Sequence, residues 1–393
     1  IDLATNKVKA KLKTGMLLGE LVEDAEVIGG ASPNSIVVGS KFAYVTNATN
    51  DNIAVIDYKK GRIVKHIPIK VDQRIDKLRG LVPFGIDLTK DEKYLFVALL
   101  GFNAVAKIDL ASEKTIGLIP TGWGTTRVKL SNDDKTIYVT SCRGLGAGPN
   151  GGKNFKIPAQ GSYIGDIQLG SFQKIENPSI DKLKAYTKQT IENTFIVKSQ
   201  TDSLPLPVLP GSKESPIKHI VFITKENRTF DEVFGQMKNI RGESNLARFG
   251  IDVTVMDKTG IVKNVNVTPN HHKIAKQFSL SDNFYCDSDA SIHGHHWMMG
   301  VIPNEWVEAN SSTEKTADYF STAPGRRFPG STGSMDPEDY AEIGGLWEAL
   351  DRKNISYYNF GQANETAHVR EDWSDTATGA AHIVMVPMQK GVW

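Results

Sequence analysis

The stretch AYVTN at residues 43–47 decides the fold of the first third of the chain, because its pattern returns twice. LFVAL (95–99) and IYVTS (137–141) repeat the same order of an apolar residue, an aromatic residue and valine. In the first two copies an Ile-Asp pair follows, with Asp57 and Asp109 each thirteen residues after the aromatic residue. Equal spacing of this kind is the signature of a repeat architecture.

The repeat length identifies the repeating unit. The aromatic residues Tyr44, Phe96 and Tyr138 are 52 and 42 residues apart, and these distances bracket the ~40 to 50 residues of a β-propeller blade. An insert around residues 71–81 accounts for the longer unit. Short strands joined by turns rich in Asn, Asp and Gly predict hairpins stacked in four-stranded sheets. We therefore predict propeller blades.

A family resemblance supports this interpretation. The strings YVTN (44–47), VIDYKKGRIV (55–64) and KIDLASEKTI (107–116) resemble the YVTN-type β-propeller family over about residues 1–145. The opening residues IDLATNK (1–7) match a part of the repeat that lies within a blade in that family. We therefore expect a partial propeller over residues 1–200 that lacks its natural N-terminus and is incomplete or completed by a protein partner.

The end of the propeller region is expected to hold a helix and a linker. Residues 179–194 place Ile180, Leu183, Thr187 and Ile191 on one helical face, which predicts an inserted helix. The proline-rich stretch LPLPVLPG (204–211) is typical of a stiff linker. The predicted domains are 1–200 (blades with the inserted helix), 201–216 (linker) and 217–393 (an α/β domain).

The second half begins with a strand-like run. Residues 217–223 form a near-continuous apolar stretch, as expected for a strand buried on both faces of a sheet. Glu226 and Asn227 follow at its carboxyl end, where open α/β sheets bind ligands, and their side-chain oxygens suit a hard divalent cation. From spacing alone, the alternative that these residues are a polar strand end or a helix cap is the more common case.

Here a second resemblance enters. The string HIVFITKENRTFDEVFG (219–235) resembles the opening motif of the phosphoesterase family that includes phospholipase C and acid phosphatases, within the alkaline phosphatase superfamily. The resemblance implies that Glu226 and Asn227 bind a divalent metal ion, which could be Zn, Mn, Ca or Mg. It also implies a phosphoester substrate.

The stretch CDSDASIHGHHW (286–297) is the second motif. A hydroxyl at a helix start can serve as a nucleophile, because the helix N-terminus and a nearby metal both stabilise a phosphoryl group. The family resemblance matches Ser291 to the nucleophile and gives one of His293 and His295 a contact with phosphate or metal. The alternative is that Ser291 is an ordinary helix cap.

Residues 345–361 predict a helix, a turn and a strand, the αβ unit of the same sheet. This part resembles the family members that carry a YVTN propeller before the phosphoesterase domain. The Asp and His ligands that complete the superfamily site have no recognisable counterpart in residues 366–393, so we expect a truncated or degenerate domain. The functional prediction is metal-dependent hydrolysis of phosphoric esters, and the alternative is a non-catalytic propeller scaffold.

Composition excludes several classes of function. Lys and Arg number 46 and Asp and Glu 45, which gives a net charge of +1 and no basic run to bind nucleic acid. No apolar stretch is long enough to span a membrane. The two cysteines, Cys142 and Cys286, form neither a disulfide framework nor a metal knuckle. From the family alone, we expect a periplasmic, cell-surface or secreted protein.

Overall fold

The computed structural model describes residues 4–16, 19–22, 25–27, 29–75, 78–144, 169–194, 216–225, 228–284, 291–300, 342–359, 365–368 and 383–386. The chain divides into two compact units. One unit combines residues 1–197 with residues 288–393, and the other contains residues 198–287.

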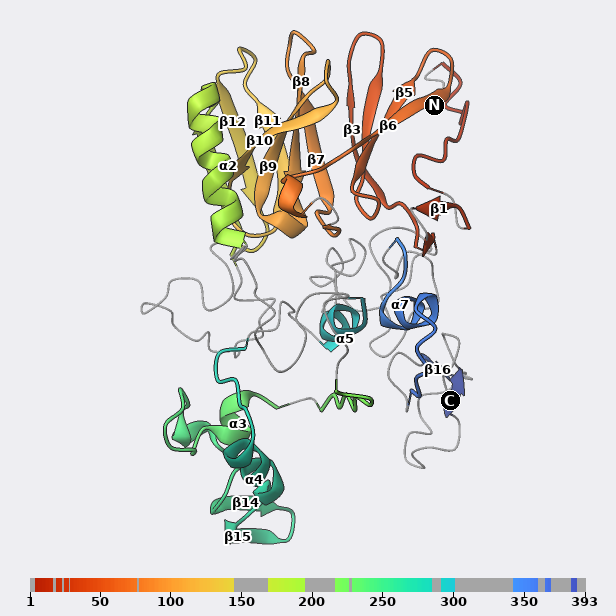
Figure 1. The fold of residues 1–393 in the computed structure, drawn as a ribbon. Coiled ribbons are helices and arrows are strands. Elements are labelled where there is room, and N and C mark those ends of the chain that lie inside the picture. The colour runs from red at the N-terminus through yellow and green to blue at the C-terminus, as the bar shows by residue number, and fades with distance from the viewer. Residues whose placement is uncertain are drawn as a thin grey trace. The chain divides into compact units, whose positions relative to one another are not determined.

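Three antiparallel sheets make up most of the N-terminal part of the first unit (Figure 1). The first sheet has four strands in the order β3 (Pro33–Val38), β4 (Ala43–Asn47), β5 (Asn52–Asp57) and β6 (Arg62–Pro68). The second repeats this order with β7 (Pro83–Leu88), β8 (Tyr94–Leu99), β9 (Ala104–Asp109) and β10 (Lys114–Pro120). Among the described residues the third sheet has three strands, β11 (Thr125–Leu130), β12 (Thr136–Ser141) and β13 (Ser171–Glu176).

These sheets confirm the prediction of stacked four-stranded hairpin units. The predicted copies 43–47, 95–99 and 137–141 lie in the equivalent strands β4, β8 and β12. A closed propeller is not formed by the described part of the chain. A small hairpin of β1 (Leu21–Val22) and β2 (Ala25–Glu26) precedes the first sheet, and the opening residues 1–3 lie outside the described residues.

The repeated aspartates close the hairpins that follow the strands β5 and β9. Oδ1 of Asp57 accepts a hydrogen bond from the backbone N–H of Lys60 at 3.0 Å. Oδ2 of Asp109 accepts one from the backbone N–H of Ser112 at 2.9 Å. A carboxylate that bonds a backbone amide a few residues on stabilises a turn, which explains why the Ile-Asp pair recurs at a fixed distance from the aromatic residue.

The cores lie between successive sheets. Tyr44 and Val55 of the first sheet pack with Val97 of the second in the larger core. Phe96 of the second sheet packs with Val128 and other residues of the third in the next core. Gly85 in β7 allows this stacking, since a Cβ there would lie 2.7 Å from the backbone oxygen of Thr126 in β11.

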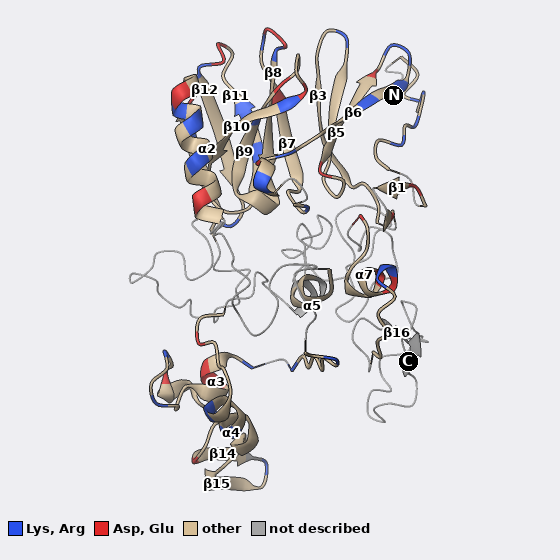
Figure 2. Ribbon diagram, in the orientation of Figure 1, with Lys and Arg blue, Asp and Glu red and all other residues tan. Residues whose placement is uncertain are grey.

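The predicted helix forms as α2 (Ile180–Thr194) and covers the outer strand β10. Leu183 is buried in the core between the second and third sheets, and Thr187 Oγ1 accepts a hydrogen bond from the backbone N–H of Leu118 at 2.9 Å. Charged residues of both signs occur along this helix (Figure 2). The predicted apolar face is correct for Leu183 and Ile191 and wrong for Ile180, the first residue of the helix, which is 74% exposed.

The second unit is small. Its elements are the helices α3 (Phe230–Phe234) and α4 (Pro269–Gln277), the 3-10 turn η4 (Ser244–Leu246) and a hairpin of β14 (Val253–Asp257) and β15 (Gly260–Val265). The buried strand predicted over residues 217–223 is wrong for the described residues, because they form no strand and Ile220, Val221 and Ile223 are about four-fifths exposed. A strand needs a paired neighbour to satisfy its backbone groups, and no other strand of the described chain pairs with this segment.

The C-terminal part of the first unit contains α5 (Ser291–Gly300), α7 (Leu346–Arg352) and a pair of short strands, β16 (Glu365–His368) and β17 (Ile383–Val386). The predicted helix over residues 345–354 is confirmed as α7. The strand expected after it does not form in residues 355–358. Within the described chain, no helix combines the length and the apolar content that a membrane crossing requires.

Candidate functional site

The structure describes the backbone of only some of the site residues predicted from the sequence. Glu226 and Asn227 lie outside the described residues. Ser291 is the first residue of α5, and His293 and His295 lie within its first two turns. The side chains of these three residues also lie outside the description. The structure therefore defines the surroundings of the candidate site, and the roles of the five residues stay predictions.

The chain turns into a helix directly after Asn227. Thr229 caps α3: its Oγ1 accepts a hydrogen bond from the backbone N–H of Glu232 at 3.3 Å, and its own backbone N–H donates to Glu232 Oε2 at 2.9 Å. This reciprocal pair is a capping box. It fixes the direction of the backbone two residues beyond the predicted metal ligand Asn227.

The Glu232 side chain is held by the capping box and by Arg248. Its pKa is lowered, first by the hydrogen bond from the Thr229 backbone and next by the side chain of Arg248, which contacts Oε1. Each oxygen of this carboxylate thus has a partner within the fold, the Thr229 backbone N–H for Oε2 and Arg248 for Oε1. Glu232 therefore has a structural role within the motif at residues 219–235.

A histidine anchors α4 to α3. The His272 ring is buried, and its Nε2 lies 2.6 Å from the backbone oxygen of Val233. The same ring stacks at a tilt on Phe234, with the centroids 5.7 Å apart. Because a carbonyl oxygen can only accept a hydrogen bond, this contact places a proton on Nε2 of His272.

The adjacent His271 contacts Lys225, a residue far from it in the sequence. Nζ of Lys225, the residue before Glu226, lies 2.9 Å from Nε2 of His271. Sequence reasoning missed His271 because it is 46 residues away from Lys225 and belongs to no motif. Only the packing of α4 on α3 brings the two side chains together.

A carboxylate shortly before the second motif is held by an arginine. The Asp282 carboxylate accepts hydrogen bonds from the backbone N–H of Arg241 at 2.9 Å and from Arg241 Nη2 at 3.1 Å. The backbone bond is the main cause that lowers the pKa of Asp282, and the guanidinium adds to it. Asp282 is therefore a structural carboxylate within the described chain.

The helix that begins at Ser291 packs against α7 at its other end. A Cβ on Gly345 would lie 2.4 Å from the backbone oxygen of Met299, so only glycine permits this approach. Met299 itself is buried. The α5 helix is thereby held in contact with the residue that precedes α7.

No group of three His, Cys, Asp or Glu side chains with the geometry of a metal site occurs within the part of the chain that the structure describes. The donor chemistry can still be compared with the metal that the sequence predicts. A carboxylate and an amide offer oxygen ligands, which fit a hard divalent cation better than a soft one. The side-chain oxygens of Glu226 and Asn227 are thus the type of ligand that a hard divalent cation prefers.

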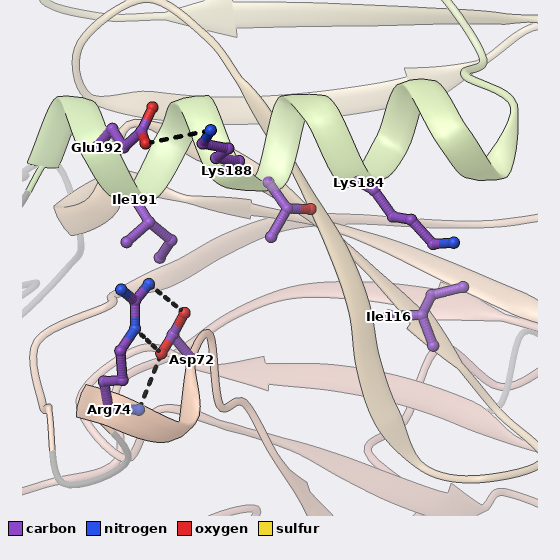
Figure 3. A pocket seen from close by; sticks show the side chains of 8 residues that line it. Asp72, Arg74, Ile116, Lys184, Lys188, Ile191 and Glu192 are labelled. Carbon is purple, nitrogen blue, oxygen red and sulfur yellow. Dashed lines mark hydrogen bonds and ion pairs between the residues drawn. The ribbon is translucent and has the colours of Figure 1, made fainter.

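A pocket of about 490 Å³ lies in the first unit, between α2, the 3-10 turn η1 (Gln73–Ile75) and β10 (Figure 3). Its charges are already paired. Arg74 binds Asp72 in a bidentate manner with contacts of 2.9 and 2.8 Å, and Lys188 lies 3.8 Å from Glu192. These contacts leave the pocket with little unmatched charge, and it contains none of the sequence-predicted site residues.

Comparison with protein families adds one match. Residues 217–324 match the model of the Phosphoesterase family. The matched range contains all five residues of the predicted site. No curated protein matches the chain.

Comparison with solved structures finds distant likenesses. They include hydrazine synthase of Kuenenia stuttgartiensis, with 20% identity and a TM-score of 0.26 over 33% of this chain and 34% of that one. A putative 6-phosphogluconolactonase of Bacteroides fragilis has 20% identity and a TM-score of 0.25 over 28% and 32% of the two chains. A catalytically inactive virginiamycin B lyase of Staphylococcus aureus, solved with quinupristin, has 19% identity and a TM-score of 0.24 over 29% and 36%. The chain spans about a third of the length of each.

Proposed function

We propose that the chain hydrolyses phosphoric esters, with Ser291 as the nucleophile and with Glu226 and Asn227 as ligands of a divalent metal ion. The observation that carries this proposal is the Phosphoesterase match over residues 217–324, because a single family match includes both motifs. The position of Ser291 as the first residue of α5 supports it.

The proposed reaction has two steps. The Ser291 oxygen attacks phosphorus, a new O–P bond forms, and the bond from phosphorus to the alcohol oxygen breaks as the alcohol leaves with a proton. Water then attacks the phosphoserine, the bond between Oγ and phosphorus breaks, and inorganic phosphate is released. Splitting the reaction in this way replaces one difficult step by two easier ones.

The residues of α5 fit the charge that develops in these steps. The first backbone N–H groups of a helix have no acceptor within the helix, so they can donate to phosphoryl oxygens. One of His293 and His295 would contact the phosphoryl group or the metal, since residues two apart do not share a helix face. A divalent cation held by Glu226 and Asn227 would favour the ionised form of the attacking hydroxyl.

Metal content and turnover test this proposal together. We expect the protein to hydrolyse an aryl phosphate with added Mg²⁺, Mn²⁺, Ca²⁺ or Zn²⁺ and to lose turnover in a chelator. Glu226→Ala should lose both bound metal and turnover, measured by elemental analysis and by aryl alcohol release. Glu243→Ala is the matched control, because the Glu243 side chain is exposed in the same unit. Equal metal content and equal turnover in the two variants would contradict the proposal.

The N-terminal sheets would position the substrate or a protein partner, and the enzyme would act in the periplasm, at the cell surface or outside the cell. This part of the proposal rests on the family resemblance. Fractionation of cells that express the full-length protein would test it, and recovery in the cytosol would contradict it.

A further inference from the structure

A buried carboxylate connects the C-terminal part of the first unit with its first sheet. Glu342 is 3% exposed, although it lies in a short turn before α7. Its Oε1 accepts a hydrogen bond from Nδ2 of Asn50 at 3.0 Å, and its Oε2 contacts Nη1 of Arg79. Its backbone oxygen accepts a third bond, from the N–H of Gly29 at 3.2 Å. Glu342 is therefore held by residues more than 260 positions earlier in the chain.

The residues that bind Glu342 are themselves fixed. Asn50 is buried in the loop between β4 and β5, and its Oδ1 accepts a hydrogen bond from the backbone N–H of Met16 at 3.1 Å. This bond orients the Asn50 amide so that the nitrogen faces Glu342. Arg79 is in the segment between β6 and β7, next to Gly80, whose N–H donates to Asp51. The partners of Glu342 are thus held in place by other residues of the N-terminal part.

The contact extends from Glu342 to α5. Gly345 follows three residues later, and its N–H donates to Glu348 Oε2 at 2.8 Å, which starts α7. The Cα of Gly345 approaches the backbone of Met299 and Gly300 so closely that a side chain would not fit. Trp347 of α7 is buried as well. A chain of contacts therefore leads from the loops of the first sheet through residues 342–345 to the end of the helix that begins at Ser291.

We propose that Glu342 is a docking residue, which holds α7, and through Gly345 also α5, on the loops of the first sheet. Buried charges need partners, and removal of one partner leaves the other charge uncompensated. Glu342 reaches both the loop between β4 and β5 and the segment before β7, so this cluster ties the residues before α7 to the first sheet. The docking itself is independent of the proposed hydrolase function. Only the expected effect of docking on Ser291 rests on that function.

The charges around Glu342 make the docking sensitive to pH. Burial raises the pKa of Glu342, and the positive charges of Arg79 and Lys70 and the Asn50 bond oppose this shift. Burial also raises the pKa of the neighbouring Asp51 to about 7, and the charge of Glu342 adds to that effect. Above neutral pH two carboxylates therefore share this buried cluster with Arg79 and Lys70. Docking should be firmest below pH 7 and weaken as the pH rises through 7.

Hydrogen exchange tests the docking directly. We expect the amides of residues 346–352 in Glu342→Ala to exchange about tenfold faster, after correction for intrinsic rates, because local opening no longer breaks the Glu342 contacts. Amides of β8 and β9 should keep their wild-type protection. Glu113→Ala is the matched control, since it removes a carboxylate from an exposed ion pair with Lys65 on the same sheets. In the control variant, the amides of residues 346–352 should exchange at the wild-type rate.

A second variant guards against a general loss of structure. Glu342→Gln keeps the size of the side chain and an oxygen for Asn50, and should give a smaller increase of exchange in the same residues. In Asp51→Asn, protection of residues 346–352 should fall less between pH 6 and pH 8.5 than in the wild type. Unchanged exchange of α7 in both Glu342 variants would overturn the proposal. Equal acceleration in α7 and in the sheets in both variants would overturn it too.

A separate readout links the docking to catalysis. If Ser291 is the nucleophile, Glu342→Gln should lower kcat for an aryl phosphate more than it changes KM, and the loss should shrink at lower pH. If exchange of α7 responds as expected and the wild type has no turnover, the docking stands and the hydrolase proposal fails. If turnover is unaffected while α7 loosens, docking stands without a positioning role.

Discussion

Asp51 is the residue whose charge should most affect the stability of the first unit. Its carboxylate accepts hydrogen bonds from the backbone N–H of Gly80 at 2.7 Å and of Val82 at 3.0 Å. Burial nevertheless raises its pKa from 3.8 to about 7, against the lowering effect of these bonds. Asn103 occupies the equivalent position between β8 and β9, with φ of 54° against 47° for Asp51. There its Oδ1 accepts a bond from the N–H of Gly124.

The raised pKa of Asp51 predicts a pH-dependent stability. Between about pH 4 and pH 7 the carboxyl is protonated in the folded state and ionised in the unfolded state. The unfolded state therefore binds fewer protons, and the free energy of unfolding falls as the pH rises through this window. We expect a loss of about 2 kcal/mol between pH 5 and pH 7 from this group.

Urea unfolding of the wild type and of Asp51→Asn at several pH values measures this effect. The variant should lose less stability than the wild type between pH 5 and pH 7 and should show the same dependence above pH 8. Parallel profiles across the whole range would show that Asp51 does not titrate in this window.

At the residue scale, the sequence predicted the repeat from a few positions. Asp57 and Asp109 were informative because their turn bonds require a carboxylate at one place in each hairpin. The roles of Glu232 and His272 could not be predicted, because they depend on Arg248 and Val233 in other elements. The predictions for Glu226, Asn227 and Ser291 rest on motif matches, and the described residues leave them as predictions.

At the scale of elements, α2 is the clearest link between sequence and stability. Leu183 is 4% exposed and packs beside Gly117, where a Cβ would collide with the Leu183 side chain. Ile180 on the same helix is 74% exposed. Leu183→Ala should therefore lower the free energy of unfolding by about 2 to 4 kcal/mol, as a cavity in a packed core does.

Ile180→Ala is the matched control, because it removes an aliphatic side chain of similar size from the exposed start of the helix. It should change stability by less than about 0.5 kcal/mol. Denaturant titration followed by circular dichroism gives both values. Similar losses in the two variants would mean that the face of α2 is assigned wrongly.

The apolar segment 217–223 shows where element prediction fails. Its composition suits a strand in a covered sheet, yet the described residues form no such strand. Local pattern predicts what a segment prefers, whereas a strand also needs neighbours to bond with. The helices α2 and α7 were predicted correctly because a helix satisfies its own backbone groups.

For the molecule as a whole, the sequence predicted antiparallel sheets in the N-terminal part and a phosphoesterase region after them. The N-terminal sheets and the Phosphoesterase match over residues 217–324 agree with that order. The grouping of residues 288–393 with the N-terminal sheets in one compact unit could not be predicted. It depends on contacts such as Glu342 with Asn50, which join residues 292 positions apart.

We propose that Ser291 accepts a phosphoryl group during hydrolysis. The most direct measurement is to incubate the metal-loaded protein with an aryl phosphate, quench it in acid and search the peptide that contains Ser291 for a phosphoryl group by mass spectrometry. We predict phosphoserine at position 291 in the wild type and in the control Ser288→Ala, and none in Ser291→Ala, which should also lose turnover. Turnover by Ser291→Ala near the wild-type rate, or a phosphoryl group on Ser288 instead, would contradict the account.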